Sequence, residues 1–174
     1  MTMTSTICST AASDAGLNAD RLGALVTVAR QAADAGGAEL MRHYGRLSSV
    51  ESKGRIGDLV TNADVAAERV VLEVLGRETP DIAVLAEESG AAGEQDSMRW
   101  CVDPLDGTTN FTHGYPFFAT SIGLTFRQRP ILGAIAVPFL GETYWGAPGH
   151  GAHCNKISIQ VSCCERLEDS LLVT

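Results

Sequence analysis

The sequence predicts an α+β fold in which two long helices, in the first half of the chain, pack on a mostly antiparallel sheet formed by the second half. Two observations lead to this prediction. Up to about residue 75, apolar residues recur every three or four positions, the period of an amphipathic helix. Beyond Pro80 the pattern changes to short apolar runs separated by Gly, Pro and charged residues, which is typical of strands joined by turns.

The composition is that of a single globular domain. The chain has 174 residues, of which 45% are hydrophobic and 20% charged. Its net charge of -8 argues against binding to nucleic acid or to anionic membrane surfaces, because both rely on clustered Lys and Arg. The sequence has neither a secretory signal nor an 18-residue apolar run. Five cysteines without a C-x-x-C pair indicate reduced thiols and a cytoplasmic protein.

Two helices are predicted, after a flexible tail over residues 1–19 that is rich in Ser, Thr and Ala. The first helix begins with Asp20 as its N-cap and ends at Gly45. Its predicted inner face comprises Leu22, Val26, Ala29, Ala33, Leu40, Met41 and Tyr44. After an exposed loop over residues 46–57, Thr61 or Asn62 caps a second helix that ends by Gly76. Its predicted inner face comprises Val65, Val71, Leu72 and Leu75.

The strands follow from the second half of the chain. They are predicted in "DIAVLAEES" (81–89), "RWCVDPLD" (99–106), residues 115–126, "ILGAIAVPF" (131–139), "TYWGA" (143–147) and "KISIQVS" (156–162). The first two runs both end in acidic residues. We therefore expect these two strands to deliver carboxylates to the same edge of the sheet.

The segment that ends the second strand contains ligands suited to a hard cation. Pro104 favours an extended backbone at Asp103, so that Asp103 finishes the strand and the chain then turns at once. Such a turn can bring the Asp103 carboxylate, the Leu105 carbonyl and the Asp106 carboxylate into one small volume, and these oxygen ligands suit Mg²⁺. Carboxylates this close repel one another unless they are protonated or bind a metal.

The next residues can bind an anion. Gly107 permits a close approach, and the amides of Gly107, Thr108 and Thr109 lie at the start of a predicted helical turn. A sequence of the type D-P-x-D-G is also favourable turn chemistry, and these residues alone leave that interpretation open.

Three further acids bear on the choice. Glu87 and Glu88 end the preceding strand, and Asp64 lies in the first turn of the second helix. Each has a purely structural interpretation, as a solvated strand end or as an acid stabilised by the helix dipole. Their occurrence together with the Asp103–Asp106 segment favours a shared metal site.

The segments "DLVTNAD" (58–64), "AEES" (86–89) and "WCVDPLDGTTNFTHGYPFFATSIG" (100–123) resemble the inositol monophosphatase family of Mg²⁺-dependent, lithium-inhibited phosphomonoesterases. The likeness runs from the first helix to the closing "SLLVT". It implies the layered α/β/α/β/α sandwich of the sugar phosphatases, here reduced to its N-terminal half over residues 20–174. It also implies two or three Mg²⁺ ions, a small phosphorylated polyol as substrate and a cytoplasmic homodimer.

The resemblance assigns roles to the matching residues. Those implied to hold metal are Glu87, Asp103, Leu105 through its carbonyl, and Asp106; those implied to bind phosphate are Gly107, Thr108 and Thr109. Thr108, hydrogen-bonded to Asp64, would activate the attacking water together with Glu87. Lys53 would lie on a mobile loop near a more weakly bound metal. Direct attack by water is favoured over a phosphoenzyme at Asp103, because the same carboxylate is wanted as a ligand.

The substrate is the least defined part of this interpretation. The favoured reaction is hydrolysis of myo-inositol monophosphate; fructose 1,6-bisphosphate, 3'-phosphoadenosine 5'-phosphate and histidinol phosphate are alternatives within the superfamily. The sequence lacks the W-D-x-A-A-G motif that supplies another metal-binding aspartate in the family. We therefore expect a fragment, a truncated gene product or a minimal relative, and a catalytically weak metal- and phosphate-binding chain is the second hypothesis.

Overall fold

The computed structural model describes residues 3–46, 50–52, 59–91 and 97–171. Its helices are α1 (Met3–Asp14), α2 (Ala19–His43), α3 (Asn62–Glu78) and α4 (Thr108–Thr112), and a 3₁₀ turn lies at Leu167–Asp169. A short pair is formed by β1 (Val50–Ser52) and β2 (Leu59–Thr61). The main sheet contains β3 (Ala83–Ala86), β4 (Gly90–Ala91), β5 (Met98–Asp106), β6 (Ala119–Phe126), β7 (Arg129–Val137), β8 (Glu142–Ala147), β9 (Gly151–Cys154) and β10 (Ile157–Ile159). The predicted Lys53 loop lies outside the described residues.

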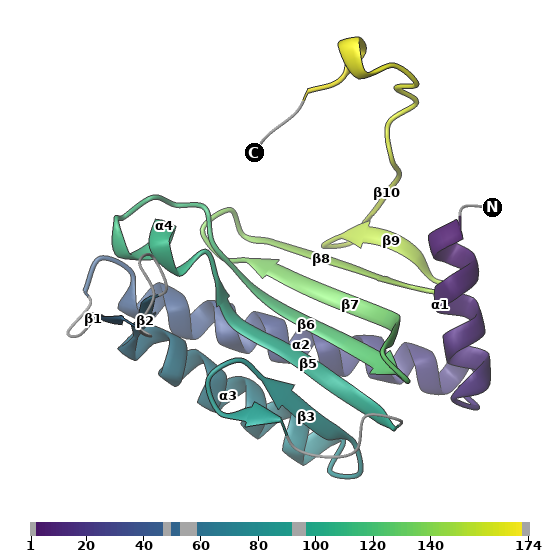
Figure 1. Ribbon diagram of the computed structural model, residues 1–174, viewed down its shortest axis with the longest axis horizontal. Helices are drawn as coiled ribbons and strands as arrows, with labels where there is room; N and C mark the ends of the chain where they lie inside the picture. The colour runs from purple at the N-terminus through teal and green to yellow at the C-terminus, as the bar shows by residue number, and fades with distance from the viewer. Residues whose placement is uncertain (1–2, 47–49, 53–58, 92–96, 172–174) are drawn as a thin grey trace.

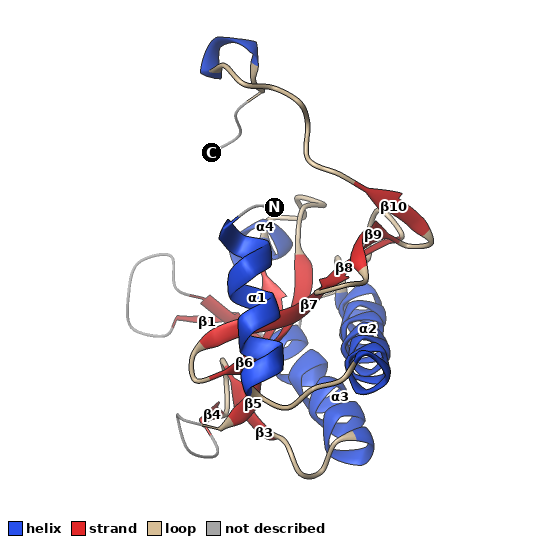
Figure 2. Cartoon of the chain, turned by 90° about the vertical axis from the view of Figure 1, so that its right-hand side faces the viewer, coloured by secondary structure: helices blue, strands red, loops and turns tan. Residues whose placement is uncertain are grey.

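The main sheet has eight strands in the order β10-β9-β8-β7-β6-β5-β3-β4. All its pairs are antiparallel except β3 with β5, which run parallel. Helices α2 and α3 lie side by side along this sheet (Figures 1 and 2). The predicted α+β class, the two long helices and the mostly antiparallel sheet are therefore confirmed.

The helices sit close to the sheet because α2 carries small residues at the contact. A Cβ built on Gly36 would lie 2.7 Å from Thr120 Cγ2 and 2.9 Å from Val71 Cγ2, so only glycine permits this approach. The larger core cluster fills the space between the helices and the sheet and contains Trp100, whose indole Nε1 donates to Thr79 Oγ1 at 2.9 Å. A smaller cluster lies beside the acidic edge and comprises Leu40, Ala63, Ala67, Leu105, Phe111 and Phe118.

The N-terminal segment differs from the prediction. Where the sequence analysis expects a flexible tail, α1 forms a helix that packs against β7. Ala11 and Ala12 are buried in the larger core cluster. The helix lacks a strong apolar stripe because its contact is made by these small residues, so the periodicity that reveals α2 is missing here.

Several details of α2 and α3 also differ. The N-cap of α2 is Asn18, whose side chain accepts from the Arg21 amide, and not Asp20. Helix α3 continues past Gly76 to Glu78. Val65, predicted on the inner face, is 58% exposed, because the face of α3 nearest α2 is lined by the smaller Ala63 and Ala67. Met41 is likewise exposed.

In the described ranges, no helix combines the length and the apolar character needed to cross a membrane. Beyond β10 the chain runs away from the sheet towards the 3₁₀ turn (Figure 1), and residues 160–171 are exposed throughout.

Candidate active site

Parallel pairing of β3 and β5 brings the acidic ends of both strands to the same sheet edge. Ala86 is the register partner of Val102, and the Glu87 amide donates to the Val102 carbonyl at 3.2 Å. Asp103 comes directly after Val102. Glu87 and Asp103 therefore lie next to each other although 16 positions separate them in the sequence.

Asp103 lies in a strongly acidic environment. Its pKa is raised to about 7, first by burial, then by the charge and hydrogen bond of Glu87, and then by the charge of Asp106. The Leu105 amide, which donates to Asp103 Oδ1 at 3.2 Å, opposes this and lowers the pKa. The two neighbouring charges that raise the pKa of Asp103, those of Glu87 and Asp106, are negative. A bound cation would reduce the repulsion among the three carboxylates.

Asp64 links the start of α3 to the segment that follows β5. Its side chain is buried, and Oδ2 accepts from the Thr61 amide at 2.9 Å and from Thr61 Oγ1 at 2.6 Å. Thr61 Oγ1 also accepts from the Ala63 amide, and the reciprocal bonds between Thr61 and Asp64 form a capping box. Asp64 Oδ1 faces Thr108 Oγ1 at 3.2 Å, and the same hydroxyl lies 3.0 Å from the Leu105 carbonyl. Thr108 thus bridges two of the predicted site residues.

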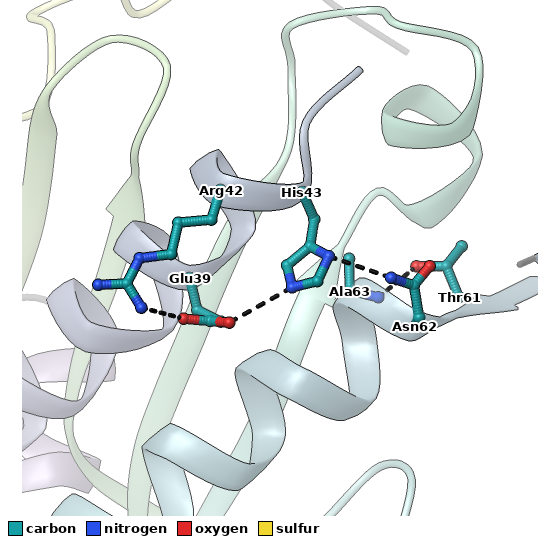
Figure 3. Close-up of polar contacts among 6 residues, drawn as sticks. All are labelled: Glu39, Arg42, His43, Thr61, Asn62 and Ala63. Carbon is teal, nitrogen blue, oxygen red and sulfur yellow. Dashed lines mark hydrogen bonds and ion pairs between the residues drawn. The ribbon is translucent and has the colours of Figure 1, made fainter. Parts of the chain in front are cut away.

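The start of α3 is also fixed to the end of α2 (Figure 3). Asn62 Nδ2 lies 3.0 Å from His43 Nδ1, and His43 Nε2 lies 3.3 Å from Glu39 Oε1. Arg42 Nη1 donates to the other oxygen of Glu39 at 2.8 Å. With Asn62 donating to Nδ1, the proton of a neutral His43 ring is on Nε2 and points at Glu39. This network fixes Asn62, the residue that follows the Thr61 cap.

Gly107 makes the turn that separates β5 from α4. Its φ is +88°, a left-handed conformation, and a Cβ there would lie 3.1 Å from the Phe117 carbonyl oxygen. The pairing of β5 with β6 is irregular between Asp103 and Asp106. Within this irregular stretch, the carbonyl of Pro104 accepts from Thr120 Oγ1 at 2.9 Å. The bulge lets Asp103 and Asp106 belong to one strand without following strict alternation.

A cavity of about 250 Å³ opens beside this turn. It is lined by Asp106, Gly107, Asn110, Phe117, Phe118, Ala119 and Val137. The cavity therefore joins one predicted metal ligand and one predicted phosphate-binding residue to a largely apolar wall.

The described side chains do not form a complete metal-coordination site. Within the described ranges, no group of three or more His, Cys, Asp or Glu side chains is placed so that it could hold a metal ion. The structure does bring Glu87 and Asp106 near Asp103, and it joins Asp64 to Thr108. The donor chemistry, carboxylates plus the Leu105 carbonyl, fits a hard divalent cation.

One buried acid near the site was missed by the sequence analysis. Glu68 is 5% exposed, and its Oε2 accepts from the Glu88 amide at 2.8 Å. The signal was present in the sequence: Glu68 follows Asp64 by four positions and precedes Val71 by three, so it lies on the inner stripe of α3. A glutamate on such a stripe needs a partner.

Comparison with known proteins settles the family. The sequence matches the inositol monophosphatase family over residues 22–174. The chain belongs to this family. Inositol-1-monophosphatase from Synechocystis sp. is 47% identical over 148 residues, which are 84% of this chain and 52% of that protein.

Solved structures of inositol monophosphatase relatives agree. Extragenic suppressor protein suhB from Bartonella henselae superposes with a TM-score of 0.77 at 40% identity, over 83% of this chain and 57% of that one. An IMPase/NADP phosphatase solved in complex with Mg²⁺ and phosphate has a TM-score of 0.63 at 25% identity, over 70% and 47% of the two chains. This member of the family thus spans about half the length of the relatives it matches.

Proposed function

We propose that residues 20–174 form the metal- and phosphate-binding part of a phosphatase that hydrolyses a small phosphate monoester. The observation that carries the proposal is the Thr108 hydroxyl, which lies within hydrogen-bond distance of both Asp64 and the Leu105 carbonyl. It stands beside the edge where Glu87 and Asp103 meet. An acid-held hydroxyl next to converging carboxylates is an arrangement that can orient a water molecule.

The proposed metal ligands are Glu87, Asp103, the Leu105 carbonyl and Asp106. Two or three ions are proposed from family membership, and Mg²⁺ as their identity is in keeping with the relative solved with Mg²⁺ and phosphate. When bound, Mg²⁺ supplies charge neutralisation for the phosphate and lowers the pKa of water. The raised pKa of Asp103 supports this assignment, because a carboxyl held against two other acids gains most from a cation.

In the proposed reaction, Asp64 accepts the hydroxyl proton of Thr108 in a hydrogen bond and so leaves the Thr108 oxygen free to accept from water. Glu87 accepts the second proton of that water. The amides of Gly107, Thr108 and Thr109 would face the phosphate oxygens, and the left-handed turn at Gly107 supports their close approach.

The proposed substrate is myo-inositol monophosphate, which the name of the Synechocystis relative supports. The alternatives named above share the phosphate end, and the cavity beside Gly107 does not choose among them. A homodimer, a cytoplasmic location and lithium sensitivity are proposed from family membership.

A second candidate is a metal and phosphate binder with little turnover. Phosphate release from inositol 1-phosphate separates the two. Turnover that requires Mg²⁺, stops on chelation and is lost in Asp106→Asn supports catalysis. Mg²⁺ binding by calorimetry without phosphate release supports the binder, and the absence of both refutes the proposal.

A further inference from the structure

We propose that Glu68 is a positioning residue that sets the place of Glu87 relative to Asp103, an inference that rests on the proposed function. Glu68 lies on α3, one helical turn after Asp64, and is not exposed to the solvent that would otherwise stabilise its charge. Its described contact is the backbone amide of Glu88. A buried side-chain oxygen that accepts from a backbone amide fixes both groups, because either one would be costly to leave buried without a partner.

The position of this bond is what gives Glu68 its role. Glu87 lies in the turn that follows β3, between two anchored amides. Its own amide is bonded to the carbonyl of Val102, the residue before Asp103. The next amide, that of Glu88, is bonded to Glu68. The turn is therefore fixed on one side to β5 and on the other side to α3.

Helix α3 consequently holds both halves of the site. Asp64 and Glu68 are four residues apart, so they occupy the same face of the helix about 6 Å from each other along its axis. Asp64 contacts Thr108 after β5, and Glu68 contacts Glu88 after β3. Without Glu68 the turn at Glu87 loses its bond to α3 while its bond to β5 and the pairing of β3 with β4 remain, so the Glu87 carboxylate is held less firmly relative to Asp103.

The test compares Mg²⁺ affinity, measured by calorimetry, in Glu68→Ala and Glu68→Gln. We expect Glu68→Ala to weaken Mg²⁺ binding by about 10- to 100-fold, the range for losing a residue that orients a metal ligand. Glu68→Gln keeps an oxygen that can accept from the Glu88 amide, and it should stay within about threefold of the wild type. Rescue by glutamine identifies the acceptor, not the charge, as the feature that matters.

Two controls on the same helix exclude simpler explanations. Glu73→Ala removes an exposed carboxylate of α3 and tests for a general charge effect. Val71→Ala opens a cavity in the core and tests for a general loss of stability. Both should leave Mg²⁺ affinity within about twofold of the wild type. If Val71→Ala weakens binding as much as Glu68→Ala, or if Glu68→Ala binds like the wild type, the inference is wrong.

Amide hydrogen exchange gives a readout that does not require the metal. The Glu88 amide should be protected in the wild type and in Glu68→Gln, and it should exchange at least about tenfold faster in Glu68→Ala. If the wild type binds no Mg²⁺ but shows this pattern, the proposed function fails while the positioning contact stands. An unprotected Glu88 amide in the wild type overturns the inference itself.

Discussion

Replacing Asp64 by alanine should destabilise the chain far more than replacing it by asparagine. Asp64 is 2% exposed, and its oxygens accept from the Thr61 amide, the Thr61 hydroxyl and the Thr108 hydroxyl. Alanine removes all three acceptors, and a buried donor left without a partner is costly. Asparagine keeps an oxygen towards Thr61 and turns an amide nitrogen towards Thr108, whose oxygen can accept from it.

The expected magnitudes follow from these contacts. A hydrogen bond to a charged group contributes about 1.5–3 kcal/mol, and an N-cap interaction contributes about 1 kcal/mol. The three bonds share one carboxylate and are not additive, while Thr61 Oγ1 still accepts from the Ala63 amide. We therefore expect Asp64→Ala to lower the free energy of unfolding by about 2–4 kcal/mol and Asp64→Asn by about 1 kcal/mol.

Urea unfolding followed by circular dichroism measures both variants. Asp81→Ala is the matched control, because the Asp81 side chain is 70% exposed and its ion pair with Arg21 spans 3.9 Å. That control should stay within about 0.5 kcal/mol of the wild type. If Asp64→Ala is as stable as Asp81→Ala, or if Asp64→Asn is as unstable as Asp64→Ala, the capping argument is refuted.

Three further predictions concern the acidic edge, the turn after it and the partly buried phenol of Tyr144. Asp103→Asn should raise the free energy of unfolding in a chelator by about 1 kcal/mol, because it removes a carboxylate that burial and two neighbouring acids destabilise. It should also abolish the rise in melting temperature that Mg²⁺ gives the wild type. An unchanged Mg²⁺ response would contradict this. Gly107→Ala should lower the free energy of unfolding, measured in urea, by about 1–3 kcal/mol, because the φ of Gly107 is +88°. Gly76 in α3 has open space around its Cβ position, so Gly76→Ala should stabilise the protein. The pKa of Tyr144 should be raised to about 12, because its hydroxyl donates to Glu142. The contribution of this hydrogen bond to stability is complete below a pH of about 10 and is lost as the pH rises through about 12. Ultraviolet titration of Glu142→Gln, with a lowered pKa expected, checks the last point.

Local chemistry made part of the fold predictable. Thr61 or Asn62 was expected as the cap of α3. The cap is Thr61, which forms a capping box because the aspartate three positions later can reach back to its amide. The two long helices and the strands from β5 to β8 follow from apolar periodicity. The convergence of two acidic strand ends was also expected, and the parallel pairing of β3 with β5 places Glu87 beside Asp103.

Other features depend on contacts between distant segments. The alanines of α1 carry too little hydrophobic signal to predict a helix, yet Ala11 is completely buried. Val65 is more apolar than Ala63, but close packing of α2 and α3 favours the smaller side chain on the inner face. Glu68 was overlooked because a glutamate in a helix is usually solvated, and its partner lies 20 positions away on a turn.

The order of these contacts explains how a site made of repelling carboxylates can be held together. Two of the acids accept from backbone or hydroxyl donors: Asp64 from Thr61 and Thr108, and Asp103 from the Leu105 amide of its own strand. These anchors act whether or not the acids repel, because they do not depend on the charge of the neighbouring acid. Burial and then repulsion raise the pKa of Asp103, while β3 and β5 stay paired at this edge of the sheet. A fold that resists this repulsion retains the electrostatic attraction for a cation, and preorganisation of this kind is what metal affinity requires.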